Sequence, residues 1–470
     1  MKLKVVIVIV AVLLLIAAGF AFWQLKSLAG KTIINNPEPK EESYITIEDK
    51  LKHKKPFSIL LLGYAGGKHD GTYLTDSLMV ARIDPATKNV YLLSIPRDTW
   101  VGLPTADGTS HHWKINAAYQ IGLDDKGYPN KPPEFKGEAG GANLAKYAAS
   151  QVTGQPIDGI VAIDFAGFKN TIDTLGGIDI EVETTFDDYA YPLDVIPDES
   201  CGHSPEDIEK FTATASAEPL HWEYFSCRYK HLHFDKGMTH MDGTTALEYV
   251  RSRHSAVDGS DFGRAKRQRN LLLAVKQKIL SAGFIPKIIP FVESLGNDLK
   301  TDISLTDIKA IIQNINELGS YQIHTYALTD KNYLNITTAT SGASILAPKA
   351  GIDTWTNIHE WVADIYSGKP EKVPMIVRVE NGTKTSGLAI KATQTLQGLS
   401  ILTVDPINSK VKTEKTSVIV YNKNIQTEDI NKVLKAFNVP SATFDTHTTD
   451  EYSVSVILGD DYAKSLLSSQ

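Results

Sequence analysis

Residues 57–95 read FSILLLGYAGGKHDGTYLTDSLMVARIDPATKNVYLLSI. Three short apolar runs lie in this stretch, at 57–62, 77–83 and 90–95, and the turn signal Asp84-Pro85 separates the last two. Apolar runs of this length that end at glycine or proline are typical of buried strands. The stretch therefore predicts the first strands of a central β-sheet.

Helical and strand-like patterns alternate after this stretch. Apolar spacing predicts helices at 143–152 and 168–175, and short apolar runs predict strands at 160–163 and 178–182. Strands that alternate with helices along the chain are typical of layered α/β folds. We therefore expect an α/β fold.

The following part of the chain has a weaker pattern. Residues 187–234 contain aromatics, prolines and both cysteines, and are expected to be loop-like. Helices are expected at 242–253 and 261–280, and residues 304–307 resemble a capping box that opens another helix. Residues 284–366 are expected to be helical and irregular and to pack against the same core.

A second, smaller α/β domain is predicted at 374–464, after a polar linker at 367–373. The apolar patterns in this part predict the order β-α-β-β-α-β. The predicted elements lie at 375–379, 389–396, 400–404, 417–421, 430–437 and 452–458.

The amino-terminal end predicts a single transmembrane anchor within 1–25. Residues 5–23 carry no charge, and a helix of that length would reach ~28 Å, close to the ~30 Å hydrocarbon core of a bilayer. Lys2 and Lys4 precede the run and place the amino terminus in the cytoplasm. The polar residues 26–54 are predicted to be a stalk linker, so the rest of the chain would lie outside the cell membrane. A cleaved signal peptide ending near Ala17-Ala18-Gly19 is the alternative.

Composition limits the possible functions. The chain has 470 residues, of which 42% are hydrophobic and 22% charged, so it contains enough apolar residues for two or three folded domains. The 48 basic and 55 acidic residues give a net charge of −7, which excludes a dedicated nucleic-acid binder. Any anion-binding site must therefore be local.

Arginine is concentrated in one short segment. The chain has nine arginines, and five of them fall within residues 251–269. The planar guanidinium donates two parallel hydrogen bonds to phosphate or carboxylate, which lysine does poorly. Several of these arginines crowd the start of the helix expected at 261–280, where the helix dipole disfavours cations unless an anion binds there. The segment predicts a phosphate-binding site, and a solvated basic face is the alternative. The five arginines are Arg251, Arg253, Arg264, Arg267 and Arg269.

A second polar cluster occurs where a predicted strand ends. Arg97 and Asp98 follow the run 90–95 after Pro96, and Asp76 precedes the run 77–83. The carboxyl ends of strands are a usual place for site residues in α/β sheets. Together with the downstream arginines, these residues predict a metal-assisted pyrophosphate site. A plain ion pair between Asp76 and Arg97 is the alternative.

These motifs resemble those of the LytR-CpsA-Psr family of membrane-anchored cell-wall glycopolymer transferases. Their order and spacing match the family across 55–282, within a catalytic domain expected at 55–366. Residues 379–383 and 458–460 are similar to the LytR C-terminal-type domain often fused to this family. The matching catalytic motifs are LLG at 61–63, TDSLM at 75–79, SIPRD at 94–98, KINAAY at 114–119, DFAGF at 164–168, LGGID at 175–179, MDG at 241–243, YVRSR at 249–253, GR at 263–264 and RQ at 267–268.

The resemblance implies a central mixed sheet flanked by helices and an extracytoplasmic phosphotransferase. Its donor would be a glycan on a polyprenyl-pyrophosphate carrier in the membrane lipid, its acceptor peptidoglycan, and its cofactor Mg²⁺ or Mn²⁺. The implied catalytic residues are Arg97, Asp98, Arg251 and Arg253. The implied pyrophosphate-binding residues are Arg97, Arg251, Arg253, Arg264, Arg267 and Gln268.

The implied metal ligands are less regular. Asp76 belongs to a matching motif, but Leu74 stands where many members have arginine, and Ala65 stands where they have aspartate. Asp70, in the nearby glycine-rich loop, is the expected replacement for the second carboxylate. His231 and His233 would share one face of a strand, but a zinc site needs further ligands, so we expect ordinary surface histidines.

Two other functions use the same features. The site could hydrolyse the pyrophosphate with water as acceptor, or the protein could be a non-catalytic envelope binding or regulatory protein.

Cys201 and Cys227 are expected to form a disulfide, because a domain outside the membrane lies in an oxidising environment. Two buried thiols are the alternative.

Overall fold

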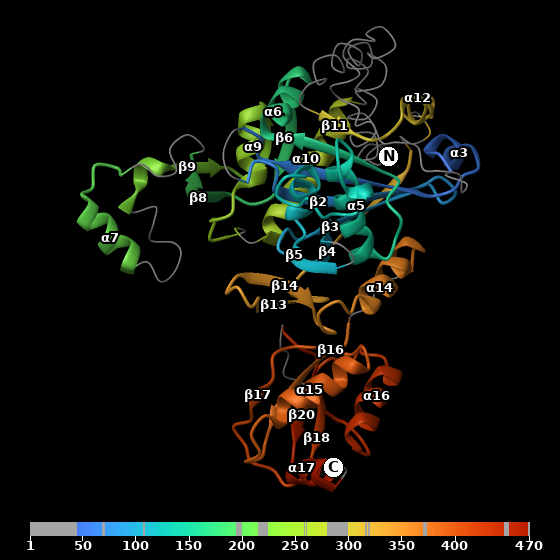
Figure 1. Ribbon diagram of the computed structural model, residues 1–470, viewed down its shortest axis with the longest axis vertical. Helices are drawn as coiled ribbons and strands as arrows, with labels where there is room; N and C mark the ends of the chain where they lie inside the picture. Colours follow the sequence, from blue (N-terminus) through green and yellow to red (C-terminus); the bar gives the residue numbers. More distant parts are fainter. Residues whose placement is uncertain are drawn as a thin grey trace. The chain divides into compact units, whose positions relative to one another are not determined.

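A computed structural model describes residues 45–67, 71–106, 109–193, 200–214, 224–257, 259, 261–279, 299–314, 317, 320–369, 374–445 and 451–468 (Figure 1). These residues form two compact units. The first contains the described residues up to Ser94 together with Gly137–Ala142 and Ile157–Ala327, and the second contains Ile95–Lys136, Asn143–Pro156 and the described residues from Leu328 onward. The predicted membrane anchor at 5–23 and Asp70 lie outside the described residues. Across the described ranges, no helix has the length and apolar character needed to cross a bilayer.

The first unit is built on a six-stranded sheet with the strand order β11-β6-β1-β2-β3-β12. β1 pairs antiparallel with β2 and parallel with β6, and β12 pairs parallel with β3. The predicted central mixed sheet is therefore confirmed. The strands are β1 (Phe57–Tyr64), β2 (Thr75–Asp84), β3 (Asn89–Ile95), β6 (Gly159–Asp164), β11 (Leu299–Thr301) and β12 (Gln322–Ala327).

Strand direction decides where the polar motifs lie. β2 and β3 are joined by only four residues, so they run antiparallel. The carboxyl ends of β1, β3, β6 and β12 therefore lie at the same edge of the sheet as the amino end of β2. We call this edge, with Tyr64, Thr75, Asp76 and Asp164 in the first unit, the site edge.

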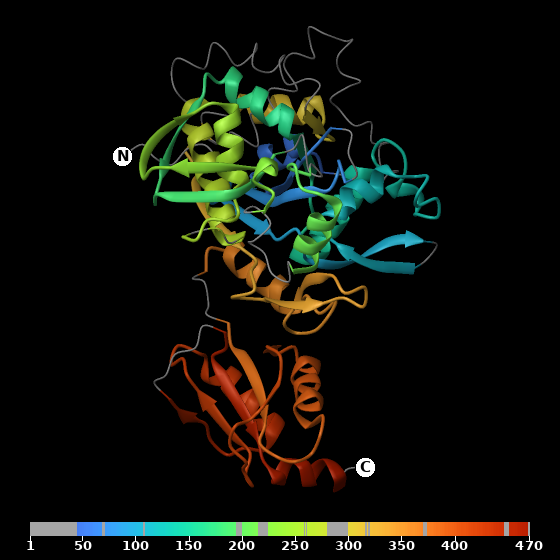
Figure 2. The same cartoon turned by 90° about the vertical axis from the view of Figure 1, so that its left-hand side faces the viewer.

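One face of this sheet packs against helices in a single apolar core. Side chains from the strands, such as Ile59, Met79 and Leu92, join Val250 and Leu271 from two helices in this core. Figure 2 shows α9 and α10 (yellow-green) side by side. The helices of this unit that contribute to the core are α3 (Ile47–Lys52), α6 (Phe165–Thr174), α9 (Gly243–Arg251), α10 (Asp261–Ile279) and α12 (Leu305–Gln313).

The end of the predicted stalk belongs to this core. Thr46 caps α3 by accepting a hydrogen bond from the Asp49 amide, and Ile47 is buried. Lys50 Nζ lies 2.5 Å from Asp158 Oδ1. Polar composition alone predicts a linker here, whereas the apolar side chains of Ile47 and Leu51 and this ion pair attach the segment to the folded unit.

The prediction that 187–234 is loop-like is wrong. The segment forms β8 (Phe186–Pro192), α7 (Pro205–Thr214), the 3-10 turn Ser226–Arg228 and β9 (Tyr229–Phe234). β8 and β9 pair antiparallel, and Figure 1 shows this ribbon leading out to α7. The two strands are separated in sequence by the α7 insertion, so no local hairpin signal marks them. A second ribbon pairs β7 (Ile178–Val182) with β10 (Gly237–Met241).

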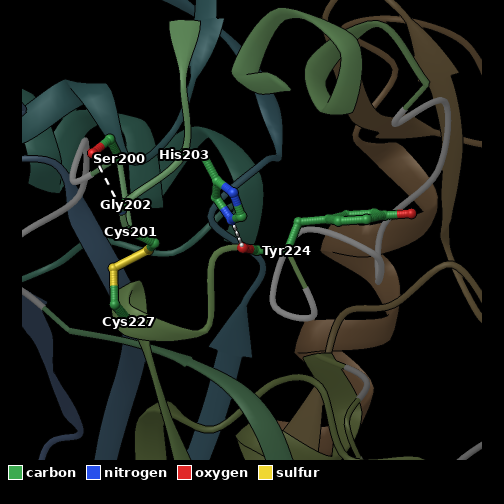
Figure 3. Close-up of a disulfide and its surroundings, with 6 residues drawn as sticks. All are labelled: Ser200, Cys201, Gly202, His203, Tyr224 and Cys227. Carbon is green, nitrogen blue, oxygen red and sulfur yellow. Dashed lines mark hydrogen bonds between the residues drawn. A yellow bond between two sulfur atoms is a disulfide. The ribbon is translucent and has the colours of Figure 1, made fainter. Parts of the chain in front are cut away.

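The predicted disulfide is present. Cys201, just before α7, is bonded to Cys227, which lies in the turn before β9 (Figure 3). The His203 imidazole hydrogen-bonds to the Tyr224 carbonyl oxygen at 2.7 Å, beside the bridge. The bond thus fixes both ends of the α7 insertion next to the ribbon.

Replacing both Cys201 and Cys227 by serine should lower the free energy of unfolding by ~3–4 kcal/mol in the chain-entropy model. Chemical denaturation of the variant and the oxidised parent protein measures this difference. Two titratable thiols in freshly isolated, unreduced parent protein would contradict both the bridge and the external placement of this domain.

Ionisation of the buried phenol of Tyr321 lowers the stability of the first unit at alkaline pH. It lies directly before β12 and is 2% exposed. Burial raises the pKa of its phenol to about 12, and the carboxylates of Glu317 and Asp84 act in the same direction. In the unfolded chain the phenol ionises near pH 10, so the folded state holds the proton more tightly and stability falls between about pH 10 and 12.

Tyr321→Phe should remove this loss, because phenylalanine has no proton to release. Between pH 9 and pH 11, the parent should lose about 1.4 kcal/mol of unfolding free energy through Tyr321, and the variant should not show this loss. Urea denaturation at the two pH values makes the comparison. Parallel pH dependence of the two proteins would show that Tyr321 ionises normally.

The second unit also consists of strands and helices. Residues 284–366 are expected to be helical and irregular, but β12 of the first unit and β13 and β14 of the second are strands that pair with partners. Polar residues interrupt the apolar pattern of β12 and β13, and β14 is only five residues long, so an apolar-run criterion does not detect them. The unit includes β4 (Trp100–Ala106), β5 (Thr109–Lys114), α4 (Ala117–Leu123), the 3-10 turn Pro133–Phe135, most of α5 (Gly140–Thr153), β13 (Leu334–Thr338), β14 (Ser344–Pro348) and α14 (Thr356–Tyr366).

The carboxyl-terminal part of this unit has its own core, formed by residues such as Val377, Leu396, Val433 and Val456. The six elements predicted there are all present, in the expected order. β15 runs parallel to β16, β17 and β20, and β18 runs antiparallel to β20. The elements are β15 (Ile376–Asn381), α15 (Leu388–Gly398), β16 (Leu402–Thr403), β17 (Ile407–Asn408), β18 (Ser417–Val420), α16 (Thr427–Phe437), β19 (Thr443–Phe444), β20 (Val454–Leu458) and α17 (Asp460–Ser468).

Candidate anion-binding site

The site edge holds two carboxylates with different surroundings. Asp164, the last residue of β6, accepts a hydrogen bond from the Gly167 amide at 2.7 Å and so caps α6. Gly66 approaches it so closely that a Cβ at Gly66 would lie 2.8 Å from the Asp164 Cβ. Asp76 is the second residue of β2 and is half-buried. Asp164 therefore has a structural role as a cap, and Asp76 is the better candidate ligand.

α10 meets β2 next to Asp76. Ser77 Oγ, one residue further along β2, donates to Gln268 Oε1 at 3.3 Å. Arg264 lies four residues before Gln268, on the same face of the helix, and is buried. Gln268 therefore contacts the residue that follows the predicted metal ligand Asp76 in β2, and Arg264 lies one helical turn away from Gln268.

Arg251 ends α9, as its spacing from Arg253 predicts. Its Nη1 donates to the Tyr191 hydroxyl at 3.0 Å. Its guanidinium carbon lies 4.2 Å from the centre of the Phe165 ring. The aromatic ring and the hydroxyl, from α6 and β8, hold the guanidinium in place, since cation–π contact and hydrogen bond act together.

Ser252 leaves the helical conformation, with φ −51° and ψ 136°. A regular helix would point Arg251 and Arg253, which are two residues apart, to opposite sides. Because Ser252 breaks the helix between them, this constraint is removed and the two side chains can serve one ligand. The Arg253 amide donates to Asp188 Oδ2 at 2.9 Å. Sequence reasoning missed Asp188, although its two-residue spacing from Phe186 indicates the buried face of a strand.

Arg267 lies inside the protein. It is 2% exposed, its Nε donates to the Tyr249 carbonyl at 2.8 Å, and its Nη2 donates to the Ser252 carbonyl. Its guanidinium carbon is 4.9 Å from the centre of the Phe186 ring. These contacts give Arg267 a structural role, and its contact with pyrophosphate stays a prediction.

Arg97 and Asp98 follow β3 and belong to the second unit. Arg97 Nε lies 3.6 Å and Lys114 Nζ 2.6 Å from the Asp98 carboxylate. The Asn116 amide donates to the Arg97 carbonyl at 3.2 Å. The two motifs SIPRD and KINAAY therefore fold together, and Lys114 is a cation that sequence reasoning did not assign to the site.

A cavity of about 270 Å³ opens at the carboxyl ends of β3 and β12, beside α10. Apolar groups of Met79, Leu92 and Ala327 form part of its wall, and Lys266 and Arg269 add positive charge. The cavity is therefore amphipathic. Its other lining residues are Ser94, Thr325 and Tyr326.

The outer face of the β8–β9 ribbon carries the two histidines singled out in the sequence. His231 Nε2 and His233 Nδ1 lie 2.7 Å and 2.8 Å from the same oxygen, Asp187 Oδ1. The hydrogen bond to Asp187 raises the pKa of His233, and that to Asp235 adds to it. Among the residues that the structure describes, no group of three or more histidine, cysteine or acidic side chains could hold a metal ion.

A mixed α/β sheet that packs against the arginine-bearing helices α9 and α10 suits an anion-binding protein, and sequence comparison identifies the family. Residues 22–351 match the LytR_cpsA_psr family, and residues 375–462 match the domain described as LytR cell envelope-related transcriptional attenuator. The chain belongs to the LytR-CpsA-Psr family.

This chain is also similar to relatives with named activities. The polyisoprenyl-teichoic acid–peptidoglycan teichoic acid transferase TagV of Bacillus subtilis is 34% identical over 279 residues, which are 59% of this chain and 57% of TagV. The transferase TagU of Enterococcus faecalis is 27% identical over 309 residues, or 64% of this chain and 79% of TagU. The crystal structure of B. subtilis TagV covers 67% of this chain and 99% of its own, with 28% identity and a TM-score of 0.44.

Proposed function

We propose that this chain is a membrane-anchored phosphotransferase that moves a glycopolymer phosphate from a polyprenyl-pyrophosphate carrier to peptidoglycan, outside the membrane. Family membership and the names of the relatives support a transferase. The observation that carries the proposal is the arrangement of Arg251 and Arg253 around one extended residue, close to α10. Forked donors placed in this way suit a pyrophosphate.

The proposed reaction is a substitution at phosphorus. A peptidoglycan hydroxyl oxygen attacks the phosphorus that bears the glycan, and the bond between this phosphorus and the bridging oxygen breaks. Polyprenyl phosphate leaves with the bridging oxygen and its electron pair, and the hydroxyl proton passes to a base. Negative charge grows on the bridging oxygen as the bond breaks, and positioned guanidinium groups stabilise such charge.

Each arginine has a proposed role in this step. Arg251, Arg253 and Arg264 bind the phosphate oxygens, with Gln268 as a neutral donor. Arg97 makes a further phosphate contact, and Asp98 orients it. Because Arg251 is already held by Tyr191 and Phe165, its guanidinium loses little freedom when the donor binds.

A divalent ion, Mg²⁺ or Mn²⁺, fits the residues present. Mg²⁺ in phosphate sites takes one or two protein carboxylates and fills its other positions with water and substrate phosphate. Asp76 supplies one carboxylate at the site edge, and Asp70 is the proposed second. Such an ion would neutralise charge on the pyrophosphate.

The donor's lipid and the anchor place the reaction at the membrane. The cavity beside α10 combines apolar walls with Lys266 and Arg269, which suits a lipid-linked anion. Residues 5–23 are the proposed single membrane span, with the amino terminus in the cytoplasm. A disulfide is typical of proteins in oxidising compartments, so the bridge supports the external placement.

Mass analysis of lipids that co-purify with the detergent-extracted protein tests the proposed donor. We expect polyprenyl phosphates or pyrophosphates in the wild-type sample and a reduced amount in an Arg253→Ala sample. Equal amounts in the two samples would show that the lipid is non-specifically co-purified and that residues 251–253 do not bind it.

A further inference from the structure

The helix α9 is interrupted at Ser252, and the backbone groups after this break need hydrogen-bond partners. Because the helix stops at Arg251, the amides of Arg253 and His254 have no partner within α9. Ser252 itself is fully buried, and its amide donates to the Glu248 carbonyl at 3.0 Å. The break in the helix between the two arginines therefore needs hydrogen-bond acceptors from elsewhere in the protein.

Asp188 supplies these acceptors. Its side chain is completely buried, and its Oδ2 accepts from Ser252 Oγ at 2.7 Å, the Arg253 amide at 2.9 Å and the His254 amide at 3.2 Å. Its Oδ1 accepts from the Ala190 amide at 3.0 Å. Burial raises the pKa of Asp188, but these hydrogen bonds outweigh it and leave the pKa below its usual range. The carboxylate is therefore ionised at neutral pH.

Arg267 holds the same turn through its carbonyl groups. The guanidinium donates to the carbonyls of Tyr249 and Ser252 and lies over Phe186, which is two residues before Asp188 in β8. Every polar group of Ser252 thus has a protein partner: Glu248 for its amide, Arg267 for its carbonyl and Asp188 for its hydroxyl. The buried Asp188 carboxylate and the buried Arg267 guanidinium thus fix the conformation of Ser252.

We propose that Asp188 and Arg267 form a positioning pair, which holds Ser252 extended so that the guanidinium groups of Arg251 and Arg253 reach the same pyrophosphate. This inference rests on the proposed function. Asp188 and Arg267 act through the turn. The strand β8 contributes in two ways, since its Tyr191 also binds Arg251 directly.

Asp188→Asn is the most direct variant. It keeps the shape of the side chain but removes the negative charge and one of the two acceptor oxygens, so it cannot accept from both the Ala190 amide and the three donors at Oδ2. Asp187→Asn is the matched control, because Asp187 is the adjacent residue and faces the histidines on the outer face of the ribbon. Ser252→Ala removes a single hydrogen bond to Asp188 and preserves both buried charges.

The test uses the full chain in detergent with Mg²⁺ and measures the affinity for inorganic pyrophosphate by calorimetry, with thermal unfolding followed in parallel. We expect Asp188→Asn to weaken binding about ten-fold or more, because small misplacements of donors have large effects. Ser252→Ala should weaken it about three-fold, in line with one lost hydrogen bond. Asp187→Asn should bind like the wild type.

A double-mutant cycle separates positioning from general stability. In an Arg253→Lys background, Asp188→Asn should weaken pyrophosphate binding much less than it does alone, because part of its effect passes through Arg253. If the two effects multiply independently, or if folded Asp188→Asn binds like the wild type, the positioning role is refuted. If Asp188→Asn does not fold, wild-type affinity in Ser252→Ala refutes it.

The outcomes also separate this inference from the proposed function. A wild-type protein that binds pyrophosphate but transfers nothing would refute the proposed function and leave the positioning role to be decided by the variants. A wild-type protein that does not bind pyrophosphate would overturn both.

Discussion

Arg253→Lys should lower the rate of glycopolymer transfer about 100- to 1000-fold and leave the domain folded. Lysine keeps the positive charge but loses the planar fork that binds two phosphate oxygens at once. Losing one positioned donor to a growing charge costs about 3–4 kcal/mol in the transition state. The main-chain bond from Arg253 to Asp188 is kept in the variant, so the turn should persist.

Arg251→Lys should give a loss of similar size, because its guanidinium is held by Tyr191 and Phe165 in a geometry that an ammonium group cannot reproduce. Arg378→Lys is the matched control, since Arg378 pairs with Glu451 in the carboxyl-terminal domain. Rates with a defined lipid donor measure the effects. Near-wild-type activity in both Arg251→Lys and Arg253→Lys would show that the cluster is only a solvated basic face.

Asp76→Asn should raise the Mg²⁺ concentration needed for half-maximal transfer about 10- to 100-fold, the range seen when groups that support a metal site are removed. The amide keeps a neutral oxygen but loses the negative charge that attracts the ion. Titrating activity with Mg²⁺ measures the shift. Asp70→Asn, in the same titration, tests the proposed second ligand.

Asp179→Asn is the control for this titration, because Asp179 is an exposed carboxylate that pairs with His240. If Asp76→Asn, Asp70→Asn and this control all follow the wild-type curve, the carboxylate assignment is wrong. The arginines alone would then neutralise the pyrophosphate.

Local patterns predicted the fold best where each strand has its own apolar run. β1, β2 and β3 are of this kind, and so are the elements of the carboxyl-terminal domain. Local patterns do not predict β8 and β9, because the α7 insertion separates the two strands and their aromatic and acidic residues are typical of a loop. Local patterns do not predict β12, because half of its residues are polar and its partner β3 is distant in the chain.

The site was predicted mainly from residue type. The density of arginine between 251 and 269 predicts an anion-binding site there, which stays a prediction, and the two-residue spacing predicts the helix end at Arg251, which the structure confirms. What a single sequence does not reveal is which arginine turns inward. Arg267 has the same chemistry as its neighbours but is buried against main-chain carbonyls, and its partner at the turn, Asp188, comes from a strand far away in sequence.

The most direct test of the proposed function follows one phosphorus atom. A polyprenyl-pyrophosphate glycan labelled at the phosphate next to the sugar is incubated with the protein, Mg²⁺ and peptidoglycan, and the products are separated. We predict that the label becomes covalently bound to peptidoglycan while unlabelled polyprenyl phosphate is released. Label recovered as free glycan phosphate would instead indicate a hydrolase, and unchanged donor would indicate a binding or regulatory protein.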